Sequence, residues 1–342
     1  MVLLTGATGF LGTHLLIELK KRNKKIRAFI RDKKKISRIE NLCKIYGLNP
    51  QEILTDIEWF VGDIKNSDDI ARSLENITEV YHTAAKVSLV SDNKEKFWQL
   101  NVKATENLVN FSLEKGIKKF CYISSIAALG ENPAGLINEE TYLNPEEKTS
   151  LYSKTKYYGE IEVWRGINEG LNAVIVNPAY ILGADGNCEG NGCLFFNLIN
   201  RGMSFYTDGI VGFVDVRDVA FLMVELMENN IFSERFILVS QNLYYKQILE
   251  WTAEALGKKM NFKRLTRFSV NIFYKFIKFL SWTNILKIPM GRTVVDNLFL
   301  NTRYSNAKIL HTFSEFKFRD IKETIFELGE YYKNFSRESR GV

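Results

Sequence analysis

Tyr152 and Lys156 are the residues whose types and spacing point most directly to chemistry. They lie four residues apart in a segment, 152–168, whose pattern predicts a helix, so both side chains fall on one face. A phenol has a reference pKa of about 10 and is a poor acid or base at neutral pH, but a nearby ammonium group stabilises the phenolate. The pair therefore predicts a site that moves a proton.

The position of this pair in the chain is more specific than its spacing. The same tyrosine–lysine spacing occurs twice more, at Tyr274 with Lys278 and at Tyr304 with Lys308. Only Tyr152 follows a predicted strand, 119–123, that runs into two adjacent hydroxyls, Ser124 and Ser125. Open α/β sheets place their sites at the carboxyl ends of the strands, so this context favours Tyr152.

A glycine-rich turn near the start of the chain predicts a nucleotide site. The apolar run 2–5 leads into this turn, and a helical pattern follows it. Glycines spaced by three allow a sharp turn and a close approach of the backbone to a diphosphate, which then accepts hydrogen bonds from the first N–H groups of the helix. The alternative is an ordinary strand-to-helix turn, which the flanking elements make the weaker interpretation. The predicted cofactor contacts are Gly6, Thr8, Gly9, Phe10, Leu11 and Gly12.

The end of the second predicted strand, 25–30, discriminates between NAD and NADP. An NAD enzyme usually places a carboxylate there for the ribose diol, whereas an NADP enzyme places a cation for the 2′-phosphate. Here Arg31 follows the strand and three lysines end at Lys35, so charge favours NADP as the cofactor. NAD is the alternative, with Asp32 turned inward to take the diol.

The end of the third predicted strand supplies a further cofactor contact. Asp63 and Ile64 follow Gly62 directly after this strand. A carboxylate at that position can accept a hydrogen bond from the adenine amino group. A turn residue at the end of the strand explains Asp63 almost as well.

Composition and charge exclude several classes of protein. The 342 residues are 46% hydrophobic and 25% charged, as in ordinary globular proteins, and their net charge is +6. The positive charges are scattered and no motif that reads bases accompanies them, so nucleic acid is not an expected partner. Four cysteines and three histidines fall at no metal-like spacing, so no metal is predicted. Because no secretory segment precedes the first predicted strand, we expect a cytoplasmic protein.

Apolar runs alternate with helical patterns along the chain, which predicts an α/β fold with a Rossmann-type doubly wound parallel sheet. After the first strand, the candidate strands are 25–30, 57–61, 79–82, 119–123, 173–177 and 235–239. Composition changes after Pro178, where a glycine-rich loop begins. We therefore predict an NADP-binding domain over 1–178, to which 210–240 returns, and a smaller C-terminal substrate-binding domain over 179–209 and 241–342.

Eight segments in order carry a family resemblance. They are Thr5 to Gly12, Gly62-Asp63-Ile64, His82-Thr83-Ala84-Ala85, Asn101 to Thr105, Ser124-Ser125, Tyr152 with Lys156 and Glu160, Asn177-Pro178-Ala179, and Phe213 to Ala220. With these segments the chain resembles the extended short-chain dehydrogenase/reductases of the NAD(P)-dependent epimerase/dehydratase superfamily. The pattern covers essentially the whole chain and is similar to that of dihydroflavonol reductases and 3β-hydroxysteroid dehydrogenases.

The resemblance implies a role for each candidate catalytic residue. Ser125 would donate a hydrogen bond to the reacting oxygen, Tyr152 would exchange the proton, and Lys156 would hold the nicotinamide ribose. Asn101 would support a proton relay through water. Ser124 stays open as an alternative to Ser125, because adjacent residues of a strand face opposite sides.

The resemblance also implies further cofactor contacts and an assembly. Thr83, Ala84 and Ala85 would line the path of the diphosphate and ribose. Pro178 and Ile181 would bound the stretch that approaches the carboxamide. Packing turns at the strand ends are the alternative for both segments. A homodimer through the two long helices beside the site is expected.

Two reaction classes of this superfamily stay open, as does a protein that binds the cofactor without turnover. Arg31 favours an oxidoreductase that uses NADP to reduce a carbonyl, or to oxidise the alcohol, of a fairly apolar small molecule. The alternative is a nucleotide-sugar epimerase or dehydratase with tightly bound NAD. Such enzymes often place an arginine where this chain has Val211, although Arg201 or Arg292 could supply that cation. The intact catalytic set argues against a protein without turnover.

An aromatic segment, 268–282, stands out in the second half of the chain. Its apolar residues are Phe268, Ile272, Phe273, Phe276, Ile277, Phe279, Leu280 and Trp282. An ordinary packed helix is the main interpretation, and the alternatives are the wall of an apolar substrate pocket or a helix that lies on a membrane surface. Lysines interrupt the segment before 18 apolar residues accumulate, so we expect no membrane span.

Overall fold

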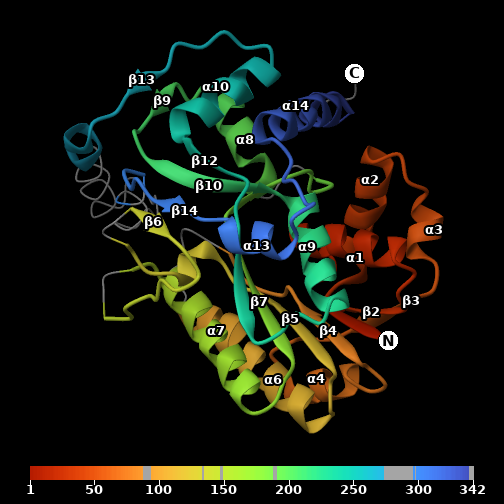
Figure 1. Cartoon of the computed structure of the whole chain (residues 1–342). Helices are drawn as coiled ribbons and strands as arrows, with labels where there is room; N and C mark the ends of the chain where they lie inside the picture. The colour runs from red at the N-terminus through yellow and green to blue at the C-terminus, as the bar shows by residue number, and fades with distance from the viewer. Residues whose placement is uncertain are drawn as a thin grey trace.

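Seven parallel strands form the central sheet, in the order β11-β7-β5-β4-β1-β2-β3 (Figure 1). This computed structural model describes residues 1–87, 94–132, 135–146, 149–187, 191–272, 296 and 298–338. The strands are β1 (Val2–Thr5), β2 (Ile26–Ile30), β3 (Ile57–Val61), β4 (Glu79–His82), β5 (Lys119–Ile123), β7 (Ala173–Pro178) and β11 (Glu234–Leu238). The sheet confirms the predicted doubly wound α/β fold.

Both faces of the sheet are buried, which explains why its strands read as continuous apolar runs. Leu4 and Cys121 face a core that includes residues of α1 (Phe10–Lys21) and α9 (Val216–Glu228). Leu3 and Phe120, their chain neighbours, face the opposite core. That second core includes residues of α4 (Ser67–Ser73), α6 (Ala104–Glu114) and α7 (Leu151–Asn168), which cover the lower face in Figure 1.

The remaining helices are short pieces around this framework. Three of them lie between β2 and β3, and a π-helical turn precedes α6. They are η1 (Lys33–Ile36), α2 (Ser37–Ile45), α3 (Pro50–Leu54), α5 (Lys94–Trp98), the π-helix η2 (Gln99–Lys103), η3 (Ile126–Ala128) and η4 (Asn191–Cys193).

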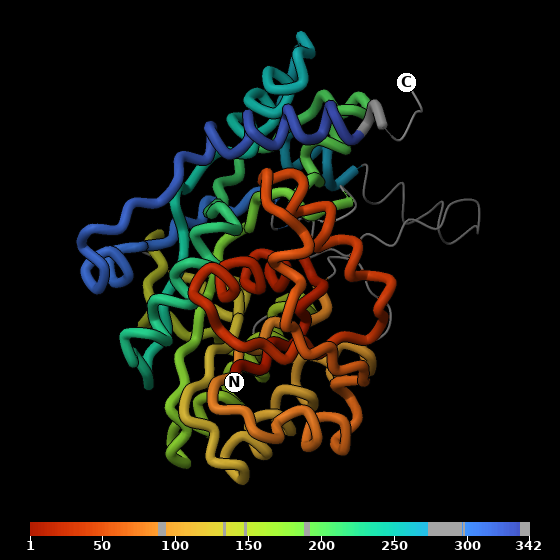
Figure 2. Tube along the Cα trace, turned by 90° about the vertical axis from the view of Figure 1, so that its right-hand side faces the viewer, coloured from red at the N-terminus to blue at the C-terminus, as the bar shows by residue number. Residues whose placement is uncertain are grey.

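The second half of the chain builds a separate layer above the carboxyl edge of the sheet. A three-stranded sheet joins β8 (Tyr180–Leu182), β10 (Ile210–Asp215) and β12 (Gln241–Tyr244). Figures 1 and 2 show α14 running across the top of the molecule, where it packs against α10. The other elements are α8 (Leu194–Asn200), α10 (Tyr245–Ala255), α13 (Ala307–Thr312), α14 (Ile321–Glu338), β6 (Leu136–Ile137), β9 (Phe205–Tyr206), β13 (Lys263–Arg264) and β14 (Arg303–Tyr304).

The segment 210–240 divides between the two layers. Its first strand, β10, pairs with β8 and β12 in the upper sheet. The following helix, α9, packs on α1, and β11 then joins the edge of the main sheet beside β7.

Only the start of the aromatic segment 268–282 lies within the described residues. Phe268 is 75% exposed and Ile272 is 53% exposed, whereas Phe273, Phe276, Ile277, Phe279, Leu280 and Trp282 lie outside the described residues. Among the helices that the structure describes, none has the length and apolarity needed to cross a bilayer.

Candidate functional site

The glycine-rich turn has a backbone that only glycine can supply. Gly6 has a φ of +73°, and a Cβ there would lie 2.8 Å from the nitrogen of Ala84. A Cβ on Gly12 would lie 2.1 Å from the carbonyl oxygen of Gly6. The turn is closed by a 2.8 Å hydrogen bond from the Gly9 nitrogen to that same oxygen. The tight turn brings the first residues of α1 directly against the end of β1.

The start of α1 fits a dinucleotide diphosphate. Gly9 is the N-cap residue and provides no side-chain cap, and the first turn holds no acidic residue. The N–H groups of Phe10, Leu11 and Gly12 therefore lack helical acceptors, as at every helix start, and they favour an anion. Thr8, which precedes the cap, is buried.

The ends of β1 and β4 are tied together beside this turn. The Thr83 hydroxyl donates to the carbonyl oxygen of Thr5 over 2.7 Å, and the Ala84 nitrogen donates to the Thr5 hydroxyl over 3.3 Å. Thr83, Ala84 and Ala85 are half-buried and follow β4 directly. The predicted contacts at the two strand ends thus lie against one another.

The residues predicted to select the cofactor lie around the end of β2. Arg31 and Lys35 are exposed, and Ile64 is buried. Asp32 accepts a 2.9 Å hydrogen bond from the nitrogen of Lys34 and so caps η1. Partial burial would raise the pKa of Asp63, but hydrogen bonds from Lys65 and the charges of Lys65 and Arg31 hold that pKa below its usual value. The positive charge of Arg31 therefore acts on the Asp63 carboxylate.

Ser125 and Tyr152 lie together at the carboxyl end of β5. Ser150 caps α7 by accepting a 3.0 Å hydrogen bond from the Ser153 nitrogen, which sets Tyr152 in the first turn of the helix. Burial raises the pKa of the Tyr152 phenol, and a hydrogen bond with the Ser125 side chain lowers it in part. Ser124 has a different partner, since its hydroxyl donates to the Glu160 carboxylate over 2.6 Å.

Lys156 is almost completely buried, at 1% exposure, and its ammonium does not contact the Tyr152 hydroxyl. It donates to the Tyr122 hydroxyl over 3.0 Å and to the Ile123 carbonyl oxygen over 2.6 Å. Tyr122 thus lies between the two predicted partners in one respect only: it accepts from Lys156, and the charge of Tyr152 acts on its phenol. An ammonium has three donors, so one is left for a ribose hydroxyl.

The environment of Lys156 changes its acidity. Burial lowers the pKa of Lys156 to about 7, and the Glu160 carboxylate raises it in part. The same ammonium helps to keep His82 neutral: burial first, and then the charge of Lys156, lower the pKa of His82 to about 3. His82 instead bonds to the hydroxyls of Thr5 and Thr105, at 2.7 and 3.0 Å.

Asn101 lies in the π-helical turn η2, buried against α7. Its side-chain oxygen accepts from the Lys86 nitrogen at 2.8 Å, and its amide donates to the Thr155 hydroxyl at 3.1 Å. A Cβ on Gly159 would lie 2.5 Å from the carbonyl oxygen of Asn101 and 2.6 Å from the Tyr122 hydroxyl. This glycine therefore lets η2, α7 and β5 meet at the site.

Pro178 and Ile181 lie after the site residue Asn177, at the end of β7 and in β8. Pro178 is buried and Ile181 is half-buried. The Asn177 amide donates to the Ser125 carbonyl oxygen over 3.0 Å. This contact joins the segment around Pro178 to the end of β5.

Three residues that the structure places beside the candidate site were missed or left without a role in the sequence analysis. Tyr122 accepts a hydrogen bond from Lys156. Its place in the predicted strand next to Cys121 already implied that the two side chains point to opposite faces of the sheet. Glu160 belonged to a matched segment but had no role. Arg235 had no signal, because its pairing with Glu160 joins residues 75 positions apart.

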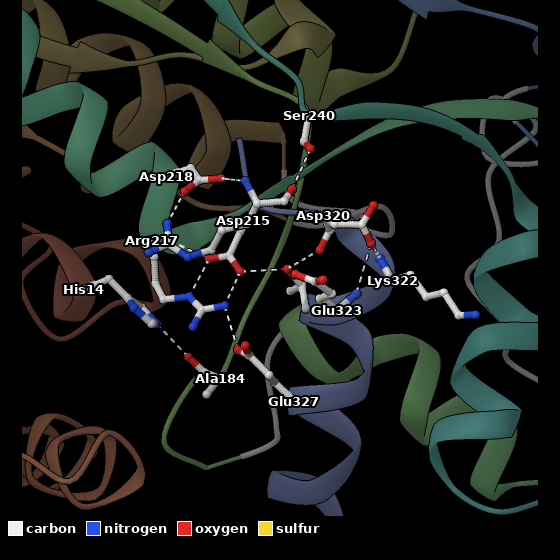
Figure 3. Close-up of polar contacts among 12 residues, drawn as sticks. His14, Ala184, Asp215, Arg217, Asp218, Ser240, Asp320, Lys322, Glu323 and Glu327 are labelled. Atoms are coloured by element: carbon white, nitrogen blue, oxygen red, sulfur yellow. Dashed lines mark hydrogen bonds and ion pairs between the residues drawn. The ribbon is translucent and has the colours of Figure 1, made fainter. Parts of the chain in front are cut away.

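A second polar cluster lies away from Tyr152, around the start of α9 (Figure 3). Asp215 is fully buried and accepts two hydrogen bonds from the Arg217 guanidinium, at 2.9 and 2.6 Å. Arg217 also pairs with Glu327 of α14 at 2.8 Å. A cavity of about 770 Å³ opens here between α2 and α14. Among the described residues, no three metal-ligating side chains gather into a metal site.

The family of the chain follows from its sequence. The sequence model of the NAD dependent epimerase/dehydratase family matches residues 2–238, which include the glycine-rich turn, Tyr152 and Lys156. The chain belongs to this family. The resemblance found in the eight segments is thereby confirmed.

Named relatives of this family member include oxidoreductases. It is 31% identical over 256 residues to sterol demethylase protein B of Methylococcus capsulatus, with 75% of this chain and 74% of the relative covered. It is 31% identical to a putative dihydroflavonol 4-reductase of Synechocystis sp., with 63% and 60% covered. It is 23% identical to a 3-beta-hydroxysteroid dehydrogenase of Mycolicibacterium neoaurum, with 63% and 56% covered.

Solved structures share the fold over the whole chain. The crystal structure of gox2253 aligns with a TM-score of 0.82 and 24% identity, covering 98% of this chain and 99% of that one. MoeE5 in complex with UDP-glucose and NAD aligns with a TM-score of 0.72 and 18% identity, covering 99% of each chain. These likenesses show the fold of this family member.

Proposed function

We propose that the protein is an NADP(H)-dependent oxidoreductase that reduces the carbonyl of a fairly apolar small molecule, or oxidises the corresponding alcohol. The convergence of Ser125, Tyr152 and Lys156 at the carboxyl end of β5 carries this proposal. A hydroxyl, a phenol and a buried ammonium supply what carbonyl reduction needs from a protein. The hydroxyl polarises the carbonyl oxygen, the phenol gives it a proton, and the ammonium stabilises the phenolate that remains.

A bound nicotinamide supplies the hydride, so the protein has only to orient the carbonyl and deliver one proton. The Ser125 hydroxyl donates to the carbonyl oxygen and polarises it. Tyr152 gives its phenolic proton to that oxygen as negative charge develops there. Lys156 and Tyr122 stabilise the resulting phenolate, and the third donor of Lys156 would hold a ribose hydroxyl of the cofactor. In the oxidative direction, the Tyr152 phenolate accepts the proton of the alcohol.

Two observations support NADP over NAD. Arg31 is exposed at the end of β2, where the 2′-phosphate of NADP would lie, and Lys35 follows on η1. One oxygen of the Asp32 carboxylate accepts from the nitrogen of Lys34 and caps η1, a role that explains this residue without a ribose diol. A phosphate gains charge-assisted hydrogen bonds from such a cation, each contributing about 1.5–3 kcal/mol.

The apolar character of the substrate is supported by the upper layer and by the named relatives. Val211 lies in β10, paired with Leu243, at the position where sugar-nucleotide enzymes often place an arginine. Arg201 is exposed at the end of α8, and Arg292 lies outside the described residues. Two relatives are named for sterol or steroid chemistry.

The test is to mix the purified protein with NADPH and a panel of aromatic and alicyclic ketones and to follow nicotinamide absorbance. Steady oxidation of NADPH, faster than that of NADH, is the expected result. Copurification of tightly bound NAD, with conversion of a UDP-sugar and no net change in absorbance, would overturn the proposal in favour of an epimerase.

We also propose a homodimer formed through α6 and α7. These helices pack on one face of the sheet, and Ile161 of α7 is 42% exposed. Light scattering on the full chain would give twice the mass of one chain, and the mass of a single chain would contradict the proposal.

A further inference from the structure

We propose that Arg235 is a positioning residue of the reaction, acting on Lys156 and Ser125 through the Glu160 carboxylate. The inference rests on the proposed function, since it concerns the proton that Tyr152 delivers. Arg235 lies on β11, at the far edge of the sheet from the glycine-rich turn. Within the part of the chain that the structure describes, it contacts neither Tyr152 nor Lys156.

Arg235 is held in position by a hydrogen bond from each of its three guanidinium nitrogens. Its side chain is 6% exposed, and one terminal nitrogen pairs with the Glu160 carboxylate at 3.0 Å. Its Nε donates to the Glu139 carbonyl oxygen at 2.6 Å, and its other terminal nitrogen donates to the Thr141 carbonyl oxygen at 2.9 Å. The guanidinium thereby fixes the carboxylate and the segment 139–141 that precedes α7.

Glu160 connects Arg235 to the residues around Ser125 through two hydrogen bonds. Its carboxylate accepts from the Ser124 hydroxyl at 2.6 Å and from the Asn177 amide at 2.8 Å. The same amide nitrogen donates to the Ser125 carbonyl oxygen at 3.0 Å. One buried carboxylate therefore connects Arg235 to the Ser124 side chain directly and to the Ser125 backbone through Asn177. Moving Glu160 would move Ser125 as well.

The charge on Glu160 also acts on Lys156, one helical turn before it in α7. The other titratable groups that face Lys156 are Tyr122 of β5 and His82 of β4, and Tyr152 of α7 acts on Tyr122. His82 is neutral because burial lowers its pKa to about 3. Among the described residues, the negative charge that raises the pKa of Lys156 is that of Glu160. Arg235 offsets part of that negative charge.

Neutralising Arg235 and neutralising Glu160 should shift the pKa of Lys156 in opposite directions. Reduction of a carbonyl needs a proton on Tyr152 and a charged Lys156 for the ribose, so activity should fall at alkaline pH when either group loses its proton. Glu160→Gln removes the negative charge, and the alkaline limb of kcat/KM should move down by about one pH unit. Arg235→Met leaves the carboxylate unopposed but still hydrogen-bonded, and the limb should move up by about one unit.

Two further variants separate electrostatics from damage. The double variant Glu160→Gln with Arg235→Met removes the charges together and should return the limb close to that of the unmodified protein. Arg235→Lys keeps the charge with fewer donors, so it should lower stability but leave the limb in place.

Arg27 provides a matched control. It is 8% exposed, pairs with Glu58 at 2.7 Å and donates to the carbonyl oxygens of Ser73 and Glu75, far along β2 from the site. Arg27→Met should reduce stability as Arg235→Met does, without moving the limb. An equal limb shift in Arg27→Met, or shifts of the same sign in Glu160→Gln and Arg235→Met, would overturn the inference.

A measurement without turnover separates this inference from the proposed function. Burial gives Lys156 a folded-state pKa of about 7 against an ordinary value of 10.5, so its charge costs stability below pH 7 and this cost disappears as pH rises from 7 to 10.5. Thermal unfolding across that window, compared with Lys156→Met, reports the titration directly. In Arg235→Met the rise should begin at higher pH, and in Glu160→Gln at lower pH.

The two failures then look different. If no carbonyl is reduced but the unfolding curves shift as stated, the proposed function is wrong and the electrostatic link stands. If NADPH is oxidised but neither the limb nor the unfolding curves move, the link is wrong and the proposed function stands.

Discussion

Ser124 and Ser125 are neighbours in the chain, but their hydroxyls have different partners. Ser124 donates to the buried Glu160 carboxylate, whereas Ser125 bonds with Tyr152 and accepts from the nitrogen of Ala127. The sequence left the choice between the two serines open, because alternation along a strand does not say which side faces the cofactor. In the structure, the hydroxyl of Ser125 is the one beside the phenol.

At the residue scale, this difference predicts opposite phenotypes for the two alanine variants. Ser125→Ala removes a donor to the reacting oxygen, so kcat should fall by about 10²–10³-fold with little change in thermal stability. Ser124→Ala deprives a buried carboxylate of a donor, so it should lower the free energy of unfolding by about 1–3 kcal/mol and leave most activity. Steady-state kinetics and urea unfolding check both, and the reverse pattern would assign the role to Ser124.

At the scale of elements, α7 carries the site because it comes unusually close to β5 and η2. Gly159 makes that approach, and a Cβ there would press on the carbonyl oxygen of Asn101 and the hydroxyl of Tyr122. Gly159→Ala should lower the free energy of unfolding by about 1–3 kcal/mol and reduce kcat, because Tyr122 and Lys156 must shift.

Gly166 of the same helix is the control for this change. A Cβ there would lie 2.5 Å from a methyl group of Val109, on α6. Gly166→Ala should destabilise the protein similarly while the folded enzyme keeps its activity. Equal losses of kcat in both variants would show that α7 tolerates no change and that Gly159 has no special position.

Much of this framework could be predicted from the sequence, for physical reasons. The bounds of β3, β4 and β5 agree with the predicted ones, because each is a short run rich in apolar and aromatic residues that is followed by glycine, threonine or serine. Tyr152, the serine pair and the glycine-rich turn could be proposed from the sequence because helical spacing and strand ends are local features. Arg235 and the contact of Lys156 with Tyr122 were not found, since they depend on which strands pair and on side chains that cross the sheet.

At the scale of the whole molecule, Asp215 links the upper layer to the nucleotide-binding part. Its carboxylate accepts from Arg217 and from the Thr324 hydroxyl of α14 at 2.8 Å, and Arg217 reaches Glu327 of the same helix (Figure 3). Burial would raise the pKa of Asp215, but the hydrogen bonds and the charge of Arg217 hold that pKa below its usual value. The carboxylate is therefore charged at neutral pH.

Asp215→Asn should loosen this link between α14 and the start of α9. The change leaves the Arg217 guanidinium without its buried counter-charge, so the free energy of unfolding should fall by about 3 kcal/mol. Asp208→Asn, which breaks an exposed pair with Arg264, should have little effect. Denaturant unfolding of both variants checks this, and equal stabilities would show that the two layers are held together elsewhere.

The most direct test of the account is a single-turnover measurement of hydride transfer from NADPH to a ketone substrate, with the unmodified protein and with Tyr152→Phe. The variant keeps the ring, the packing of α7 and the Lys156 contacts with Tyr122 and Ile123, but it has no proton to give. We predict that NADPH still binds, by fluorescence, and that its oxidation slows by at least about 10²-fold. Oxidation at an unchanged rate in Tyr152→Phe would show that another group supplies the proton, and the central claim would be wrong.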